Sequence, residues 1–445
     1  MCIRDSMLGD EIRSLEDYIE LEDALFEEVD REIYAHVPTG PAMQLERYSR
    51  GSAADPAVRS ANWNRTFEWA VPDPRGAVLL LHGMSDSPYS LRALGEGMRK
   101  PGYHVLGLRL PGHGTVPAAL RSVHWSDMAA AVELGLKHLQ SLGGDLPLHV
   151  VGYSTGGPLA LDHTLKALED TQLPLPSSLV LVSPAIRVHP TGALARFKDA
   201  LSVLPGGDNF AYLAIMAEFD PFKYNSFATN AAAQVYQLTR DVGRRIDAAL
   251  AQDSQRLERM PPILVLKSTV DATVSTRAVV DNLLDGLPGG RNELILFDIN
   301  RSASLVSTLL VRDPAPLTRR LLARKSLPFA VTFVTNEHED SRAVVARRKA
   351  AFSAQLSDDQ PLRVSWPQTV VSLSHVALTF PPDDPLYGRF PPDSEQELFL
   401  GNLAITGERG LLRLPGDWML RLRYNPFYDY LQRRVLAWFE EVPEA

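Results

Sequence analysis

The chain has 445 residues, of which 45% are hydrophobic and 22% charged, and its formal net charge is −9. This length and composition can bury one large hydrophobic core or two smaller ones, so we expect a globular protein rather than a disordered one. The acidic balance argues against a nucleic-acid partner, because polyanions are held by basic patches. The lone cysteine, Cys2, excludes an internal disulfide framework and a cysteine-based metal site.

Residues 1–65 are expected to form an N-terminal helical extension. The opening MCIRDS (1–6) resembles translated adapter sequence, so we expect the natural start at Met7 or upstream and exclude these residues from the fold. Residues 10–34 carry apolar side chains at helical spacing, which predicts an amphipathic helix, and 38–55 looks like an irregular linker.

Because no run of 18 apolar residues is present, we expect no transmembrane segment. A missing leader or anchor stays open, and the compartment is unknown, cytoplasmic by default.

From residue 66 onward, short apolar runs alternate with helical stretches, which is typical of a parallel sheet covered on both faces. We expect strands at 76–83, 103–110, 148–153, 178–183, 262–268 and 293–299, and helices at 87–100, 126–141, 155–169 and 275–286. The segment 184–260 has no clear strand and is too long for an ordinary connection, so it is a candidate cap. Further along we expect a strand at 329–337, a helix at 341–352, a strand or extended loop at 370–380 and a final helix at 425–442.

Ser154 lies in the stretch PLHVVGYSTGGPLAL (147–161), between an apolar strand and an apolar helix. Gly152 and Gly156 flank it, and small neighbours allow the sharp turn that presents a serine oxygen as a nucleophile. The motif alone is weak evidence, and the alternative is a glycine-rich turn whose serine only caps the helix. The strand-to-helix context favours the nucleophile.

A serine nucleophile needs donors for its oxyanion. One strand ends at His82-Gly83, and the following loop can direct the backbone N–H of Met84 toward the serine, while Thr155 would supply the second N–H. His82 itself is interpreted as a structural loop residue, because it precedes the nucleophile, against the chain order nucleophile, acid, histidine.

The acid and the base are sought after Ser154 in the chain. Asp271 follows the expected strand 262–268, on a loop at the carboxyl edge of the sheet, where α/β folds gather catalytic groups. Asp298 and Asp241 are alternatives, but the first is still inside a strand and the second lies in the expected cap.

Only two histidines follow Asp271, namely His338 and His375. His375 follows an extended apolar run and precedes the final helix, so it is the preferred base. His338 lies among acidic residues and is interpreted as part of a solvated loop or helix cap.

Taken together, LLLHGMSDSPYS, LPGHGT, GYSTGG, SPA, DATV and SHVAL resemble the α/β-hydrolase fold, in its monoacylglycerol lipase, lysophospholipase and carboxylesterase branch. The resemblance covers about residues 70–300, the region of His375 and the last helix. It implies a hydrolase domain at 66–445, with a mostly parallel, doubly covered sheet and a helical cap at 184–260. The family's nucleophile, acid and base would fall on Ser154, Asp271 and His375, and its oxyanion donors on Met84 and Thr155.

One departure from the family concerns spacing. In simple members the histidine follows the acid closely, whereas here Asp271 and His375 are far apart in the chain. We therefore expect an insertion at 300–368 that carries an extra strand and helix, either extending the sheet or forming a second flap.

The resemblance implies a serine hydrolase that cleaves a small-molecule ester or lipid through an acyl-enzyme, with no cofactor and no metal. An aminopeptidase or acyltransferase with the same triad is the alternative, and Glu218 and Asp220 raise the peptidase reading because carboxylates can hold a substrate ammonium. A non-catalytic binder of this fold is a third class.

Apolar cap residues could line an acyl trough or only attach the cap to the body. These residues are Leu201, Leu204, Phe210, Tyr212, Ile215, Met216, Phe219, Phe222, Tyr224 and Phe227.

Overall fold

The computed structural model describes residues 12–143, 145–187, 211–252, 254–302, 315–368, 370–392, 397–401 and 421–441. The chain divides into two compact units, the first ending at Pro261 and the second running from Pro262 to Glu441. Each unit contains its own run of hydrogen-bonded strands.

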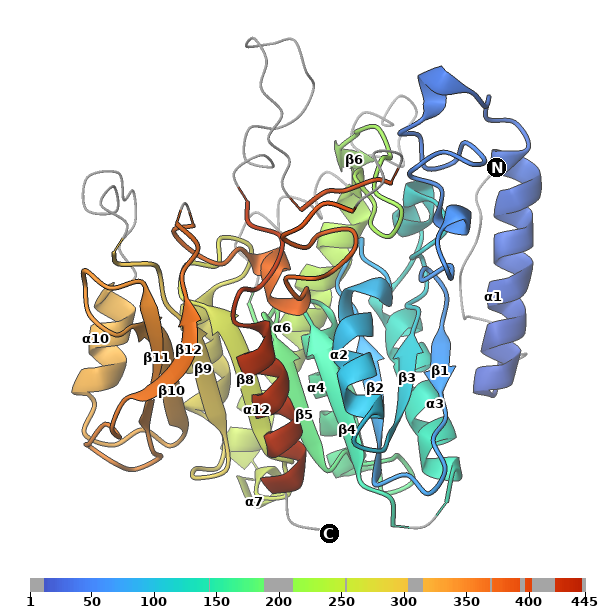
Figure 1. The fold of residues 1–445 in the computed structure, drawn as a ribbon. Helices are drawn as coiled ribbons and strands as arrows, with labels where there is room; N and C mark the ends of the chain where they lie inside the picture. The colour runs from blue at the N-terminus through green and yellow to red at the C-terminus, as the bar shows by residue number, and fades with distance from the viewer. Residues whose placement is uncertain are drawn as a thin grey trace. The chain divides into compact units, whose positions relative to one another are not determined.

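The first unit is built on five strands in the order β1-β3-β2-β4-β5 (Figure 1). β2, β3, β4 and β5 pair in parallel, and β1 runs antiparallel to β3 at the edge. Their side chains are buried along the whole length of β2 to β5, as expected for parallel strands covered on both faces. The strands are β1 (Phe67–Trp69), β2 (Gly76–Leu81), β3 (Tyr103–Leu108), β4 (Leu148–Tyr153) and β5 (Ser178–Val182).

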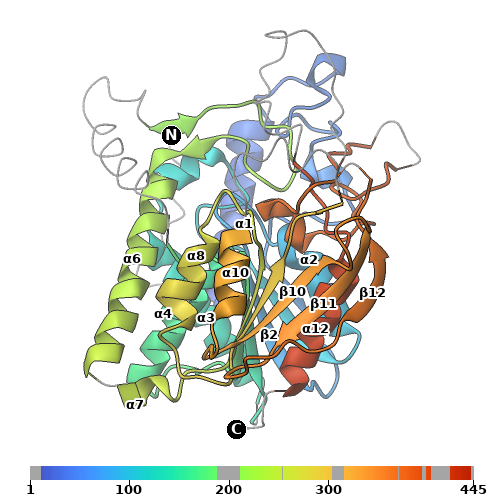
Figure 2. The ribbon, with the colours of Figure 1, turned by 90° about the vertical axis from the view of Figure 1, so that its left-hand side faces the viewer.

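Helices follow these strands in alternation. They are α2 (Tyr89–Arg99), α3 (Trp125–Ser141) and α4 (Gly156–Glu169). The expected cap contains the two-stranded hairpin β6 (Tyr212–Ala214) and β7 (Phe227–Ala228) and the long helix α6 (Thr229–Gln252), which is followed by α7 (Ser254–Leu257). Figure 2 shows α6 running beside α4. The two short strands were not predicted. The residues Leu201, Leu204 and Phe210 of the expected cap lie outside the described part.

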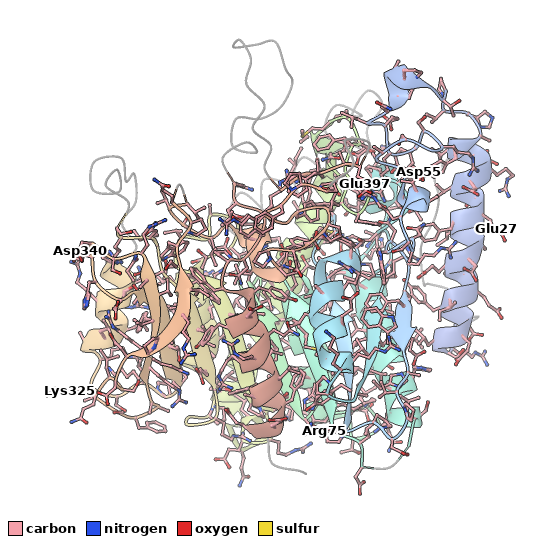
Figure 3. The ribbon with its side chains drawn as sticks, viewed as in Figure 1. Glu27, Asp55, Arg75, Lys325, Asp340 and Glu397 are labelled. Carbon is pink, nitrogen blue, oxygen red and sulfur yellow. The ribbon has the colours of Figure 1, made fainter. Side chains whose placement is uncertain are left out.

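The N-terminal extension packs onto the first unit through α1 (Leu15–Val29). Ser14 caps this helix by accepting the N–H of Asp17, whose carboxylate accepts the N–H of Ser14 in return. Leu25 and Val29 are buried in a cluster of apolar side chains. The opposite side of the helix is solvated, and Figure 3 shows the exposed Glu27 projecting from it. The apolar side of this amphipathic helix is thus buried, and its polar side faces solvent.

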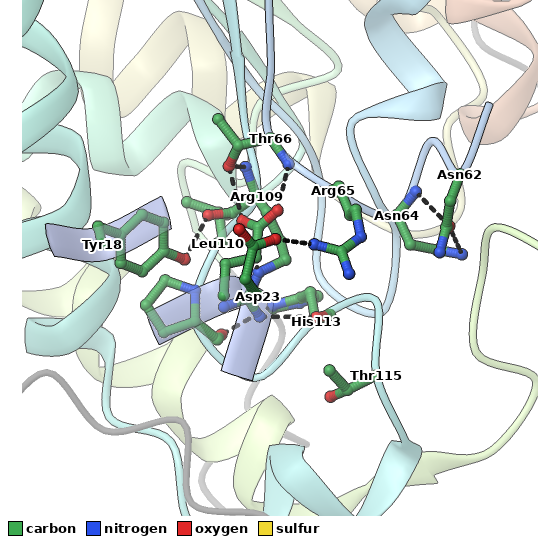
Figure 4. A network of polar contacts seen from close by, with 12 residues as sticks. Tyr18, Asp23, Asn62, Asn64, Arg65, Thr66, Arg109, Leu110, His113 and Thr115 are labelled. Carbon is green, nitrogen blue, oxygen red and sulfur yellow. Dashed lines mark hydrogen bonds and ion pairs between the residues drawn. The ribbon is translucent and has the colours of Figure 1, made fainter. Parts of the chain in front are cut away.

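A buried ion pair joins this extension to the end of β3. The guanidinium of Arg109 is fully buried and donates from Nε to Oε2 of Glu22 at 3.0 Å. Thr66 donates both its N–H and its hydroxyl to the same carboxylate, and Tyr18 donates to the carbonyl of Arg109 at 2.7 Å (Figure 4). Because both charges have hydrogen-bonded partners, they can be buried without large penalty.

The second unit is built on five strands in the order β8-β9-β10-β11-β12. β8, β9 and β10 pair in parallel, and β10, β11 and β12 form an antiparallel meander. These strands are β8 (Ile263–Ser268), β9 (Glu293–Phe297), β10 (Ala330–Asn336), β11 (Ala343–Lys349) and β12 (Gln360–Ser365). The helical elements are α8 (Thr276–Val279), which continues as one π-helical turn (Val280–Leu284), α10 (Ala315–Ala323), the 3-10 helix η7 (His375–Thr379) and α12 (Tyr428–Glu441).

The expected helix at 341–352 is wrong, because this segment forms β11. Its alanines and arginines favour a helix, but Val344 and Val345 are β-branched and buried, and six consecutive residues pair with β10. Pairing in the sheet therefore overrides local helix propensity. Among the described residues, the insertion at 300–368 thus contains the helix α10 and the three strands β10, β11 and β12, where one strand and one helix were expected. The segment 370–380, expected as a strand or extended loop, contains the 3-10 helix η7. The fold class is the expected one, a mostly parallel sheet covered by helices.

Candidate active site

Ser154 occupies a strained turn between β4 and α4. Its φ is +52°, in the left-handed region that non-glycine residues rarely adopt. The backbone is fixed on both sides, since the Ser154 N–H donates to the carbonyl of Val182 and its carbonyl accepts from Ala185, both at 3.0 Å. Strain of this kind persists only where surrounding contacts hold it.

The glycines around this serine lie so close to neighbouring backbone atoms that no Cβ fits there. A Cβ on Gly156 would lie 2.1 Å from the carbonyl oxygen of Leu81, and one on Gly152 would lie 2.5 Å from the carbonyl oxygen of Gly156. β2, β4 and the start of α4 therefore approach more closely than any side chain permits. A Cβ on Gly83 would lie 3.0 Å from the Cβ of Ser154, so the loop after β2 lies directly against the serine.

The two expected oxyanion donors lie beside Ser154. Thr155 is buried at the N-terminal end of α4, and Met84 is half-buried in the loop after β2. Neither backbone N–H donates a hydrogen bond to any residue that the structure describes. The next residue, Ser85, has a φ of +64°, so this loop is also held in a left-handed turn.

His82 has the structural role expected of it. Its Nε2 accepts the N–H of Leu110 at 3.0 Å, which leaves Nδ1 as the protonated nitrogen that donates to the carbonyl of Gly83 at 2.9 Å. Burial, with a contribution from His113, holds the pKa of His82 well below its usual value. The ring is therefore neutral and connects the ends of β2 and β3.

A segment of the expected cap packs against and hydrogen-bonds to the loop that carries Met84. The ring of Phe222 stacks on Tyr89 with centroids 4.3 Å apart, and the N–H of Tyr224 donates to the carbonyl of Ser85 at 2.8 Å. Lys223 lies 3.7 Å from the buried carboxylate of Asp86. Burial raises the pKa of Asp86 to about 6, and Lys223 only partly offsets it. Of the apolar residues of the expected cap, Phe222 and Tyr224 thus contact the loop after β2 and the start of α2, whereas Ile215 is exposed.

The carboxylates of Glu218 and Asp220 accept backbone N–H groups from the same segment of the expected cap. Both oxygens of Glu218 accept backbone N–H groups, from Asn225 at 2.9 Å and Ser226 at 2.8 Å. Oδ1 of Asp220 accepts the N–H of Phe222 at 3.0 Å. These contacts are those of residues that shape a turn.

In the second unit, Asp271 and His375 lie together although 104 residues separate them in the chain. Nδ1 of His375 lies 2.8 Å from Oδ2 of Asp271, and the carboxylate side chain is fully buried. Oδ1 accepts the backbone N–H groups of Thr273 and Val274. An ionised carboxylate accepts, so Nδ1 carries the proton and Nε2 is the basic nitrogen of the ring.

Lys267 is a third member of this group, which the sequence analysis missed. Its side chain is fully buried, and Nζ lies 2.7 Å from the same Oδ2 of Asp271. Burial alone would raise the pKa of Asp271, but the neighbouring His375 and Lys267 hold it well below its usual value. The available signal was a lysine at the end of an otherwise apolar strand, four residues before a carboxylate, because lysine is rarely buried without a partner.

The loop that carries His375 is anchored to the ends of β8 and β9. Ser268 donates its hydroxyl to the carbonyl of Leu373 at 3.0 Å. Asn300 donates its N–H to the carbonyl of Val371 at 2.7 Å and its side-chain amide to that of Val370 at 2.9 Å. The chain thus returns to β9 after the meander, which explains how a long insertion leaves the histidine beside the acid.

The alternative acids and base have other surroundings. Asp298 forms a two-pronged ion pair with Arg301 and accepts the hydroxyl of Thr335. Asp241 pairs with arginines of its own helix. His338 is exposed in the turn between β10 and β11.

Two further features of the described residues concern metal binding and membranes. Within the described ranges, no cluster of three or more His, Cys, Asp or Glu side chains is arranged to hold a metal ion. No described helix combines the length and the apolar character that a membrane crossing requires.

The parallel strands with covering helices and the strained serine after β4 define an α/β-hydrolase. A family model described as "Serine aminopeptidase, S33" matches residues 72–298, just over half of the chain. The chain therefore belongs to this family, and it is a carboxylic ester hydrolase of the lipase and esterase branch.

The relatives carry lipase and phospholipase names. The chain is 28% identical over 247 residues to a thermostable monoacylglycerol lipase of Bacillus sp. (strain H-257), covering 55% of this chain and 88% of the relative. It is 26% identical over 121 residues to the phospholipase YtpA of Bacillus subtilis (strain 168), covering 27% of this chain and 44% of that protein.

Solved structures also match. A chain of the metagenome-derived lipolytic enzymes LipS and LipT matches with a TM-score of 0.42 and 22% identity, covering 53% of this chain and 87% of that one. The monoacylglycerol lipase of Paleococcus ferrophilus matches with a TM-score of 0.39 and 18% identity, covering 52% of this chain and 88% of its own.

Proposed function

We propose that the protein is a serine hydrolase whose triad is Ser154, Asp271 and His375, and that its substrates are monoacylglycerols, lysophospholipids or short acyl esters. The observation that carries the proposal is the positive φ of Ser154 at the tight turn after β4. This strained turn is how α/β-hydrolases present a nucleophile. The names of the two bacterial relatives support a lipid ester as the substrate class.

In this proposal His375 is the general base. Its Nδ1–H donates to the buried Asp271, so Nε2 takes the proton of the Ser154 hydroxyl as the oxygen attacks the ester carbonyl. Asp271 holds the ring in this tautomer and stabilises the imidazolium that forms. His375 then protonates the leaving alcohol, and water activated by the same ring releases the acid.

The backbone N–H groups of Met84 and Thr155 would stabilise the oxyanion. They come from the loop after β2 and from the N-terminal end of α4, where the helix dipole favours negative charge. A Cβ on Gly83 would lie 3.0 Å from the Cβ of Ser154, so the loop that carries Met84 runs beside this serine, which supports the proposed role. The route requires no cofactor and no metal.

An aminopeptidase is a second candidate, because the family description names that activity. It would need carboxylates to hold the substrate ammonium. Glu218 uses both of its oxygens on backbone N–H groups, which favours esters over peptides. An acyltransferase would differ only in the acceptor of the acyl group.

The test is hydrolysis of p-nitrophenyl esters of two to sixteen carbons by wild type and by Ser154→Ala. We expect the substitution to reduce kcat by about 10⁴-fold or more while the protein stays folded, because the remaining groups only bind the substrate and stabilise the oxyanion. Circular dichroism checks the fold of the variant. Ester turnover that persists in Ser154→Ala would move the nucleophile elsewhere.

The substrate is then assigned with a second panel. Monoacylglycerols and lysophosphatidylcholine are compared with aminoacyl amides, and glycerol is added as an acceptor to reveal acyl transfer. Release of fatty acid from the first two would support the proposal. Cleavage of the amides alone would favour the aminopeptidase.

A further inference from the structure

Lys267 has no role in the mechanism above, although it touches the acid. It ends β8 with its side chain fully buried, and its Nζ lies 2.7 Å from Oδ2 of Asp271. A buried ammonium is costly unless it is paired and hydrogen-bonded. A triad carboxylate that only needs to orient a histidine does not require a second cation.

Two donors share one oxygen of this carboxylate. Oδ2 of Asp271 faces Nζ of Lys267 at 2.7 Å and Nδ1 of His375 at 2.8 Å. Oδ1 is occupied by two backbone N–H groups, from Thr273 and Val274. The carboxylate is therefore fixed in position by four donors, and its negative charge interacts with both the Lys267 amine and the histidine.

We propose that Lys267 is a positioning residue that tunes the base, its ammonium offsetting part of the Asp271 charge that would otherwise stabilise protonated His375. The inference rests on the proposed function, because it assumes that His375 is the catalytic base. In the described part of the second unit, the ionisable groups that face the Asp271 carboxylate are Lys267, at the end of β8, and His375, on η7. Burial lowers the pKa of Lys267, and the charge of Asp271 opposes this shift.

The consequence is a wider acidic working range. A base works only when it is unprotonated, and a nearby carboxylate favours the protonated imidazolium. With Lys267 beside Oδ2, this attraction is weaker, so activity persists to lower pH. Without Lys267, the imidazolium is more stable and the acid limb of activity moves to higher pH.

The experiment measures the pH dependence of kcat/KM on a p-nitrophenyl ester for wild type, Lys267→Met and Lys267→Gln. We expect both variants to shift the acid limb upward by roughly one pH unit. Lys267→Gln keeps a donor without the charge, so it separates the effect of charge from that of the hydrogen bond. Lys267→Arg, which keeps the charge, should retain the wild-type limb.

Lys349→Met is the matched control. Lys349 is also buried in the second unit, but its ammonium donates to the carbonyls of Leu322 and Arg324 at the end of α10. The control should lower stability and leave the acid limb in place. An acid limb that stays at the wild-type pH in folded Lys267→Met and Lys267→Gln would overturn the inference.

A readout without turnover separates this inference from the proposed function. The ring-proton NMR signal of His375 is assigned by its loss in His375→Gln, and its titration midpoint is compared between wild type and the Lys267 variants. An upward shift in the variants would support the inference even if no ester is cleaved. Equal midpoints would overturn it even in an active esterase.

Discussion

The two parts of the proposed catalytic machinery are built in opposite ways. Around Ser154 the geometry comes from backbone, with a positive φ, glycines that admit no Cβ and hydrogen bonds between main-chain groups. The Asp271–His375 pair is made by side chains, and 104 residues separate its members. A nucleophile that depends on backbone tolerates little local change, whereas an acid–base pair tolerates a long insertion as long as the chain returns to the same place.

The largest effect on kcat is expected from a substitution in the Asp271–His375 pair. His375→Ala should reduce kcat by about 10⁴-fold or more, because in the proposed triad His375 takes the proton of the Ser154 hydroxyl. His338→Ala, the matched control in the exposed turn of the meander, should leave kcat within about twofold of wild type. Steady-state kinetics on the same ester checks both. The reverse pattern would place the base in the insertion.

Around Ser154, a substitution is expected to act through a steric clash with the backbone. A Cβ at Gly156 would meet the carbonyl oxygen of Leu81 at 2.1 Å, and neither backbone can move without disturbing β2 or the serine turn. Gly156→Ala should therefore destabilise the protein by about 3 kcal/mol and lower kcat. Urea unfolding and ester kinetics measure the two effects.

The control for this change is Gly243→Ala. Gly243 lies inside α6, where an added Cβ meets nothing within 4 Å. Since alanine favours a helix, this variant should gain about 0.5–1 kcal/mol of stability and keep its activity. If both alanine variants behaved alike, close packing would not explain the glycine at 156.

A smaller, pH-dependent effect is expected from Asp86, next to the proposed oxyanion loop. Its pKa is raised from 3.8 to about 6 in the folded state, so ionisation opposes folding. The penalty is absent below about pH 4 and complete above about pH 6, where it approaches about 3 kcal/mol. The stability gain of Asp86→Asn over wild type should therefore be greater at pH 8 than at pH 4. Urea unfolding at both pH values tests this, and a gain that does not change with pH would contradict it.

The same contrast explains what could be predicted from the sequence. The surroundings of Ser154 are local, so the strand, glycines and helix were readable from about fifteen consecutive residues. Asp271 was placed by the strand before it, and His375 by chain order and elimination. Lys267 and Glu22 were missed, because a buried charge is recognised only once its partner is known to lie beside it.

The meander shows where local patterns mislead. Segment 341–352 has the composition of a helix, but it pairs along β10 because burial of Val344 and Val345 in the sheet outweighs a difference of a few tenths of a kcal/mol per residue in propensity. The antiparallel pairing of β10, β11 and β12 was missed with it, because neither β11 nor β12 was expected to be a strand.

The ion pair between Glu22 and Arg109 has a consequence for producing shortened versions of this enzyme. The family match begins at residue 72, and a gene trimmed to that limit would omit Glu22, Tyr18 and Thr66. Arg109 would then lose its carboxylate partner, and breaking a buried ion pair by removing one partner costs about 3–5 kcal/mol. Since whole domains are stable by only about 5–15 kcal/mol, a minimal catalytic fragment is expected to be poorly soluble, and recombinant work should retain the extension.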